Sequence, residues 1–323
     1  MIEAINLTKR YGHKTAVDNI SFTVKPGTVT GFLGPNGAGK STTMRMIMGL
    51  DKPTSGKVTV NGHPYRELSA PLCEVGALLD AKGLHGSRSA RSHLRQLAAS
   101  NGIPTKRVDE VLEITGLTSV AKKRVKGFSL GMGQRLGIAA ALLGDPGVLL
   151  FDEPVNGLDP EGVKWVRETC RRLAGEGRTV FISSHLMSEM AQTADHLLVI
   201  GRGRILTAGP VNDVIASATT DRVRVASPQA TQLAELMASR NLAARPVAPN
   251  VLETTATTAA TIGELAAQGG IVLHELTTIR ASLEEAYMTL TSDSVEYRTD
   301  PASQAQMQQA QVRQAVPQGS ARG

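Results

Sequence analysis

The sequence predicts an α/β fold built on a mostly parallel sheet, followed by a smaller α+β unit. Strands and helices alternate between residues 148 and 200, which is typical of a parallel sheet covered by helices on both faces. A glycine-rich loop at residues 34–39 lies between an apolar strand and a helix. After residue 218 the order of the predicted elements changes, so we expect a second unit to begin there.

The first unit opens with short β-type segments and continues with helices. Its early strands are predicted at 2–7, 16–24, 28–33 and 57–60, the last followed by an Asn61-Gly62 turn. Its early helices are predicted at 40–49, 88–100, 108–115 and 134–144. The alternating part then comprises strands 148–151, 179–183 and 196–200 and helices 160–174 and 186–194.

The second unit is predicted to contain strands 222–225, 244–247, 251–255 and 271–276 and helices 231–240, 261–267 and 282–290. This βαββαβ order, with one further helix, is that of the ferredoxin-like fold. From about Thr291 the chain is rich in Gln, Ala and Ser and lacks apolar periodicity, which predicts a disordered tail. The expected domains are therefore 1–218, 219–290 and 291–323.

Composition and charge narrow the class of protein. No apolar run reaches the ~18 residues that a spanning helix needs, and no signal peptide is recognised at the start, so we expect no integral membrane protein. Cys73 and Cys170 are the two cysteines; they exclude a disulfide framework and are expected to be reduced thiols of a cytoplasmic protein. Between Asp80 and Arg135, basic residues outnumber acidic ones by eleven to four. Such a patch can face nucleic acid, anionic lipid or nucleotide phosphates, or can be a solvated helical surface.

The strongest motif follows the third predicted strand. It reads Gly34-Pro35-Asn36-Gly37-Ala38-Gly39-Lys40-Ser41-Thr42. Glycines let backbone N–H groups turn toward one anion, and the N-terminus of the next helix adds positive potential. Lys40 is suited to neutralise β- and γ-phosphate charge, and Ser41 to offer its hydroxyl to Mg²⁺. The motif therefore predicts a phosphate-binding loop.

A second motif ends the apolar strand 148–151 with two carboxylates, Asp152 and Glu153. Acids at the carboxyl end of a buried parallel strand lie at the ligand crevice of an α/β sheet. We expect Asp152 to hold Mg²⁺, directly or through water, and Glu153 to polarise a water for attack on the γ-phosphate. Together the two motifs predict a nucleotide hydrolase.

Five further segments accompany these motifs. They are Tyr11 in Arg10-Tyr11-Gly12, Asp80 after Val75-Gly76-Ala77-Leu78-Leu79, Phe128-Ser129-Leu130-Gly131-Met132-Gly133-Gln134-Arg135, Asn156-Gly157-Leu158-Asp159, and Ser184-His185. The Tyr11 ring is suited to stack on adenine, although a core tyrosine would also fit, and His185 also fits a histidine satisfied at a strand end. With these segments, residues 2–218 resemble the ATP-binding subunit of an ABC transporter. The resemblance identifies them, in order, as the A-loop, Q-loop, signature, D-loop and switch histidine.

The resemblance implies a P-loop NTPase fold with an antiparallel β subdomain and a helical subdomain. It also implies that two chains enclose two ATP molecules, each between one chain's phosphate loop and the other's signature. Ser129 and the N–H groups from Gly131 onward begin a helix and suit a second anion site. By the resemblance His185 contacts the γ-phosphate, and Asp159 joins Glu153 and His185 as a catalytic residue.

Two segments depart from the family pattern. Signatures usually read Leu-Ser-Gly-Gly-Gln, whereas this one has Leu130 and Met132 around the retained Gly131. Asp80 replaces the Q-loop glutamine, and its carboxylate is also a hard oxygen ligand for Mg²⁺. Both departures resemble the daunorubicin-resistance type of drug exporter, as does the Leu-Glu-Glu segment that begins at Leu283.

The expected function is that of the ATP-binding and ATP-hydrolysing subunit of an ABC exporter. We expect it to bind ATP and Mg²⁺, to form a homodimer around two nucleotides, and to drive a separate multi-span permease from the cytoplasmic face of the cell membrane. Drugs or other hydrophobic compounds are the expected cargo, and no nucleic-acid partner is expected. Two alternatives stay open: a soluble ABC-type ATPase acting on the ribosome or DNA, and a non-hydrolysing regulatory ATP-binding subunit.

Overall fold

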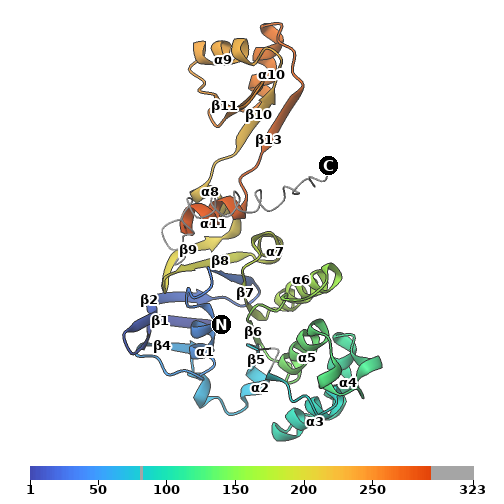
Figure 1. The fold of residues 1–323 in the computed structure, drawn as a ribbon. Helices are drawn as coiled ribbons and strands as arrows, with labels where there is room; N and C mark the ends of the chain where they lie inside the picture. Colours follow the sequence, from blue (N-terminus) through green and yellow to red (C-terminus); the bar gives the residue numbers. More distant parts are fainter. Residues whose placement is uncertain (81–82, 292–323) are drawn as a thin grey trace, which may run out of the picture.

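The computed structural model describes residues 1–80 and 83–291. The predicted disordered tail lies outside them, apart from Thr291. The described residues form three sheets, two in a large unit and one in a small unit that projects from it (Figure 1). Within these residues, none of the helices combines the length and the apolar character needed to cross a membrane.

The central sheet of the large unit has six strands in the order β5-β6-β7-β3-β8-β9. They are β3 (Val29–Leu33), β5 (Val75–Leu78), β6 (Val148–Phe151), β7 (Thr179–Ser184), β8 (His196–Gly201) and β9 (Arg204–Pro210). Neighbours run parallel except β8 and β9. Every residue of β3, β6 and β7 is buried, as parallel strands covered on both faces should be. The edge strand β9, where most residues keep some exposure, was not predicted.

The second sheet is antiparallel, with the order β2-β1-β4. Its strands are β1 (Ile2–Tyr11), β2 (Lys14–Val24) and β4 (Ser55–Val60). β4 pairs with β1, and beyond the Asn61-Gly62 turn only a single Val60–His63 bridge forms. Phe22 of β2 stacks on Phe181 of β7 with ring centroids 5.9 Å apart, and Phe181 stacks on Phe32 of β3 at 5.1 Å. These rings join the two sheets in one core.

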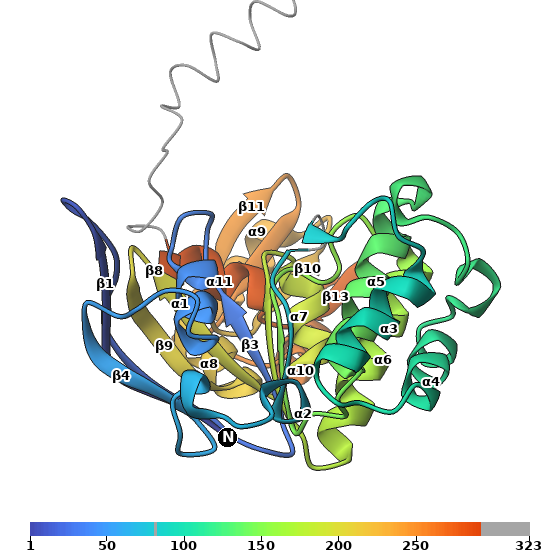
Figure 2. The same cartoon turned by 90° about the horizontal axis from the view of Figure 1, so that it is seen from below.

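Helices cover the central sheet (Figure 2) and form a separate lobe beside β5 (Figure 1). They are α1 (Lys40–Ile47), α2 (Pro71–Glu74), α3 (Ala90–Ser100), α4 (Lys106–Ile114), α5 (Leu130–Leu142), α6 (Pro160–Gly175), α7 (Met187–Thr193) and α8 (Val211–Ala218). The lobe is built from α3, α4 and α5, whose buried Leu94, Leu112 and Leu136 belong to the core of the large unit. The guanidinium of Arg135 on α5 lies 4.5 Å from the ring centroid of Trp165 on α6.

The small unit has the predicted βαββαβ order. Its elements are β10 (Arg222–Ala226), α9 (Ala230–Ser239), β11 (Arg245–Ala248), β12 (Val251–Thr254), α10 (Ala259–Gln268) and β13 (Glu275–Ile279). The strands form an antiparallel sheet in the order β11-β12-β10-β13, and Leu233, Met237 and Ile262 contribute to a core of its own. β13 begins later than predicted, because residues 271–274 lie outside the sheet.

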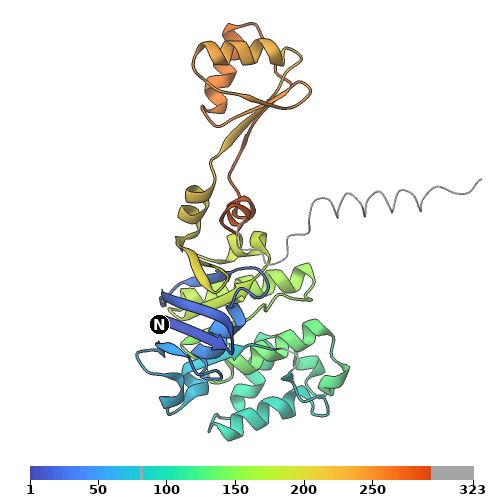
Figure 3. The ribbon, with the colours of Figure 1, turned by 60° about the vertical axis from the view of Figure 1, so that its left-hand side comes forward.

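The last helix, α11 (Leu283–Thr291), packs on the large unit although the sequence places it in the range 219–290. Its buried Leu283 and Tyr287 share a core with Val211 and Val214 of α8, and it also contacts α7. Figure 3 shows the chain leaving the large unit after α8 and returning to α11 beside it. The domain ranges themselves remain predictions.

Candidate nucleotide site

Four of the predicted site segments lie where parallel strands end. Gly34 follows β3, Asp80 lies two residues beyond β5, Asp152 follows β6 and His185 follows β7. These strands are neighbours in the sheet, and the carboxyl ends of parallel strands meet at one edge. Four loops that are distant in sequence therefore meet along one edge of the sheet.

At two positions of the phosphate loop, neighbouring backbone lies so close that only glycine fits. A Cβ on Gly34 would lie 2.5 Å from the carbonyl oxygen of Ile200, and one on Gly39 would lie 2.6 Å from that of Ala16. Gly39 also has a φ of 112° and precedes α1, whose first-turn N–H groups have no partner within the helix. The N–H of Gly203, in the β8–β9 turn, donates to the carbonyl of Ala38 at 3.0 Å. Two neighbouring segments, one at Ala16 and one at residues 200–203, thus pack closely against the loop.

Lys40 lies inside this loop. It is only 6% exposed, and its Nζ donates to the carbonyl oxygen of Gly34 at 2.6 Å. Its Nζ is 3.8 Å from Oε1 of Glu153. Burial lowers the pKa of Lys40, although the charges of Glu153 and Asp152 oppose that change. The ammonium group is therefore already placed where the loop would hold phosphates.

Glu153 bridges the loop lysine and the switch histidine. Its Oε2 lies 2.7 Å from Nδ1 of His185. The other oxygen of the same carboxylate, Oε1, faces Lys40. Its backbone has a φ of 50°, and its N–H donates to Oγ of Ser183 at 2.9 Å. The Ser183 hydroxyl in turn donates to Oδ1 of Asp152 at 2.5 Å. Ser183, which sequence reasoning missed, thus orients both acidic residues.

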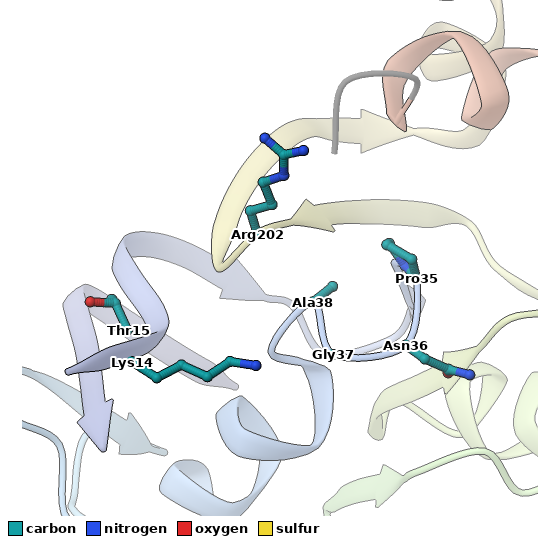
Figure 4. A pocket seen from close by; sticks show the side chains of 7 residues that line it. All are labelled: Lys14, Thr15, Pro35, Asn36, Gly37, Ala38 and Arg202. Atoms are coloured by element: carbon teal, nitrogen blue, oxygen red, sulfur yellow. The ribbon is translucent and has the colours of Figure 1, made fainter. Parts of the chain in front are cut away.

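Two hollows adjoin the phosphate loop. One, of about 190 Å³, is lined by the loop together with Ala16, Ser41, Thr42 and Glu153. The other, of about 240 Å³, is lined by residues 35–38 of the loop and by Lys14, Thr15 and Arg202. In Figure 4 the Lys14 side chain points toward the loop, whereas that of Arg202 extends away from it. Sequence reasoning missed Lys14, Thr15 and Arg202. Arg202 carries no local signal, because only the β8–β9 turn brings its backbone beside the loop.

The acidic and hydroxyl groups fit Mg²⁺ that arrives with a nucleotide. Among the described residues, no three His, Cys, Asp or Glu side chains cluster to hold a metal by themselves. Mg²⁺ commonly uses one or two protein carboxylates together with phosphate oxygens and water. The exposed Ser41 and the half-buried Asp152 offer that minimal set beside the loop. Asp80 is exposed beyond β5.

Tyr11 ends strand β1 and is not a core residue. It is 48% exposed, and its hydroxyl donates to Oδ2 of Asp51 at 2.9 Å. The Nζ of Lys9 lies 4.9 Å from the ring centroid. The ring is therefore fixed at its polar end and accessible for stacking.

Ser129 and Asp159 cap helices in this chain. The Ser129 hydroxyl oxygen accepts from the N–H of Met132 at the start of α5, and Oδ1 of Asp159 accepts from the N–H of Gly162 at the start of α6. Neither residue lines the two hollows. α5 and α1 lie in different parts of the large unit (Figures 1 and 2). The chain does not bring its signature to its own phosphate loop.

Comparison with known proteins identifies the family. Residues 17–156 match the family described as ABC transporter. The bacitracin transport ATP-binding protein of Bacillus licheniformis is 46% identical over 213 residues, which cover 65% of this chain and 70% of the relative. The chain belongs to the ABC transporter ATP-binding protein family. It is an ABC ATPase, and the predicted family is confirmed.

Further matches cover the rest of this ABC ATPase. The daunorubicin resistance ATP-binding protein of Streptomyces coeruleorubidus is 33% identical over 301 residues, covering 88% of this chain and 94% of the relative. This confirms the resemblance to the drug-export type. A solved ATP-binding subunit of an ABC transporter is 25% identical, with a TM-score of 0.62 over 67% of this chain and 92% of that one, which confirms the fold of the large unit. Residues 221–284 match a domain of unknown function.

Proposed function

We propose that this ABC ATPase hydrolyses MgATP to drive a separate membrane permease that exports drugs or other hydrophobic compounds. The observation that carries the catalytic part is the line of contacts from Lys40 through Glu153 to His185 at the mouth of the phosphate loop. It joins a phosphate-neutralising cation, a general base and a histidine in one arrangement.

Nucleotide binding would redirect the groups that now pair within the loop. Phosphate oxygens would compete with the Gly34 carbonyl for the Lys40 ammonium, and the N–H groups at the start of α1 would donate to them. Tyr11 would stack on adenine. Mg²⁺, held by Ser41 and Asp152 with Asp80 near it, would supply positive charge to the phosphates when bound.

Hydrolysis needs a base beside the γ-phosphate. Glu153 would accept the proton of the attacking water, and Ser183 fixes its backbone for that task. His185 lies within hydrogen-bond distance of the same carboxylate, so its ring would be held close to the γ-phosphate.

A second copy would complete each site. Ser129 lies away from the phosphate loop of its own chain, and its oxygen caps α5, which leaves the hydroxyl proton to donate elsewhere. A phosphate bound by another copy is a suitable acceptor at this helix N-terminus. A homodimer that encloses two ATP molecules would satisfy both sites.

The part of the proposal that concerns the membrane rests on the names of relatives and on a basic surface segment of this chain. Relatives named for bacitracin transport and daunorubicin resistance support drug export, and the cytoplasmic face of the membrane is where such a subunit meets its permease. The exposed residues Lys122, Lys123, Arg124 and Lys126 lie just before the signature. Each basic residue near anionic lipid contributes about 1 kcal/mol.

The catalytic proposal is tested by Glu153→Gln. We expect phosphate release to fall at least 100-fold, because the amide cannot accept the proton, while MgATP stays bound and the chain becomes dimeric by size. Glu168→Gln is the matched control, since Glu168 is exposed on α6 and forms an ion pair with Lys164 of the same helix. Equal turnover in the Glu153→Gln protein would contradict the role given to this carboxylate.

The transport proposal needs a second experiment. Tagged Glu153→Gln protein is captured from gently solubilised cells with and without MgATP. A multi-span membrane protein near one-to-one is the expected partner. Ribosomal proteins or nucleic acid without a membrane protein would overturn the transport role and leave the ATPase activity unaffected.

A further inference from the structure

Two segments of the large unit interlock through paired leucine–glycine contacts. Leu130 is the first residue of α5, and Gly157 lies in the loop between Glu153 and α6. A Cβ on Gly157 would lie 2.0 Å from Cδ2 of Leu130 and 2.8 Å from its Cγ. Reciprocally, a Cβ on Gly131 would lie 3.2 Å from Cδ2 of Leu158. Each leucine therefore lies against the glycine of the opposite segment.

The contact at Gly157 leaves no room for a side chain. Because Cγ of Leu130 is also too close, rotating only the tip of the leucine would not relieve an added Cβ. Gly157 has a φ of 73°, a conformation that glycine adopts without strain. Leu130 is 51% exposed, so burial in the core does not explain its position. The leucine in the signature and the glycine in the following loop fit as a pair.

A hydrogen bond reinforces the same junction. Nε2 of Gln134, one turn into α5, donates to the carbonyl oxygen of Asn156 at 3.4 Å. The start of α5 is therefore attached to this loop at three consecutive positions, 156, 157 and 158. The loop begins at Glu153 and ends at Asp159, and the attached helix begins just after Ser129.

We propose that the Leu130–Gly157 pair positions Ser129 relative to Glu153, so that the loop after the catalytic carboxylate and the signature serine move together. Both are positioning residues, since neither lines the nucleotide hollows. The proposal rests on the proposed function, in which Ser129 acts on ATP bound by a second copy. Displacing the pair would disturb the hydrolytic step more than ATP capture by Lys40, Ser41 and the loop.

The test is a double-mutant cycle on the full chain with Leu130→Ala, Gly157→Ala and both together. Gly157→Ala should lower kcat at least tenfold with the KM for ATP within about twofold, because an added methyl displaces Leu130 and with it the start of α5. Leu130→Ala alone should lower kcat by about three- to tenfold, because it removes the contact without adding a clash. The double variant should return to within about threefold of Leu130→Ala, since the clash is gone. The backbone strain of alanine at position 157 is present in Gly157→Ala and in the double variant. It therefore cancels when the effect of Leu130→Ala is compared with and without Gly157→Ala.

Gly177→Ala provides the matched control. Gly177 has a φ of 88°, and nothing lies within 4 Å of its Cβ position. It therefore carries the same backbone strain without a steric partner. We expect its effect on kcat to be unchanged by Leu130→Ala.

Thermal unfolding of the same variants separates a packing role from a positioning role. Coupling in both Tm and kcat supports the proposal. Coupling in Tm, with effects on kcat that simply multiply, shows only a structural contact and overturns the proposal. Independent effects of the two substitutions on both Tm and kcat overturn it as well. If the unaltered chain fails to hydrolyse MgATP, the catalytic proposal and this one fall together, whereas multiplicative kcat effects in an active protein overturn this one alone.

Discussion

Asp159 shows how one side chain can serve the fold at a position that the family resemblance assigns to catalysis. Its carboxylate accepts from the N–H of Gly162 at 2.9 Å and so satisfies a free donor at the start of α6. Pro160 follows as the first helical residue, where proline is tolerated because its position needs no N–H. The sequence predicts a catalytic role for Asp159, and the structure adds a structural one.

Substitution separates these two roles of Asp159. Asp159→Ala should lower the free energy of unfolding by about 1 kcal/mol, because the cap is lost, whereas Asp159→Ser should retain most of it. If the carboxylate also acts in hydrolysis, both variants lose turnover. Urea unfolding and phosphate release measure the two properties. Full turnover in the Asp159→Ser protein would restrict this residue to capping α6.

At the same scale, the sequence predicts site residues that stand in short motifs and misses those that arrive through the fold. Lys40 and Ser41 directly follow a glycine-rich loop, and Asp152 directly follows an apolar strand, so short motifs predict all three. Ser183 looks like one more buried strand residue, although it orients both acids. Arg202 adjoins the loop only because Gly203 donates to Ala38 across 165 residues of chain. No local pattern encodes such contacts.

At the scale of elements, α11 is the clearest case where sequence order and packing diverge. Its amphipathic pattern predicts a helix correctly, but the pattern does not say which surface the apolar side will cover. The neighbouring elements in sequence belong to the small unit, whereas Leu283 and Tyr287 pack with α8. Arg222 of β10 donates to Oε1 of Glu285 at 2.7 Å, so one polar contact still links α11 to the small unit.

Tyr287 gives α11 a measurable anchor. Tyr287→Ala should destabilise the large unit by about 3 kcal/mol, because a buried aromatic is lost, while Tyr287→Phe should cost little. Burial raises the pKa of Tyr287 from 10.0 to about 12. Since the pKa of Tyr287 in the folded chain exceeds that in the unfolded chain, the stabilisation of the folded state by the protonated Tyr287 is complete below pH 10. It is lost as the pH rises toward 12.

Unfolding by urea at pH 8 and at pH 11 checks both statements. Between these pH values, Tyr287→Phe should lose less stability than the unaltered chain. An unchanged unfolding midpoint in Tyr287→Ala would mean that α11 is not anchored on the large unit.

At the scale of the whole molecule, the small unit and the large unit do not share a buried core. The small unit has its own buried cluster around Leu233, and the large unit has two others that share its sheets. The βαββαβ order and the parallel sheet follow from element order, so the sequence predicts both units. The sequence does not predict that two chain segments, one after α8 and one before α11, connect the two units. That arrangement depends on where α11 packs.

Leu233→Ala tests this separation. Leu233 is fully buried, and its truncation should cost about 2–5 kcal/mol. We expect two unfolding transitions, with only the one belonging to the small unit shifted, and kcat for ATP unchanged. Calorimetry measures the transitions. A shift of both together would show that the two cores unfold as one.

The chain contains one tryptophan, and its place has a practical consequence. Trp165 lies on α6 beneath the guanidinium of Arg135 on α5, so its indole senses a charge carried by the signature helix. A displacement of α5 relative to α6 changes the distance from this charge to the indole ring. It therefore changes the wavelength and intensity of the tryptophan fluorescence. The protein therefore contains its own optical reporter for the segment that would meet a second copy's nucleotide, and no dye has to be attached.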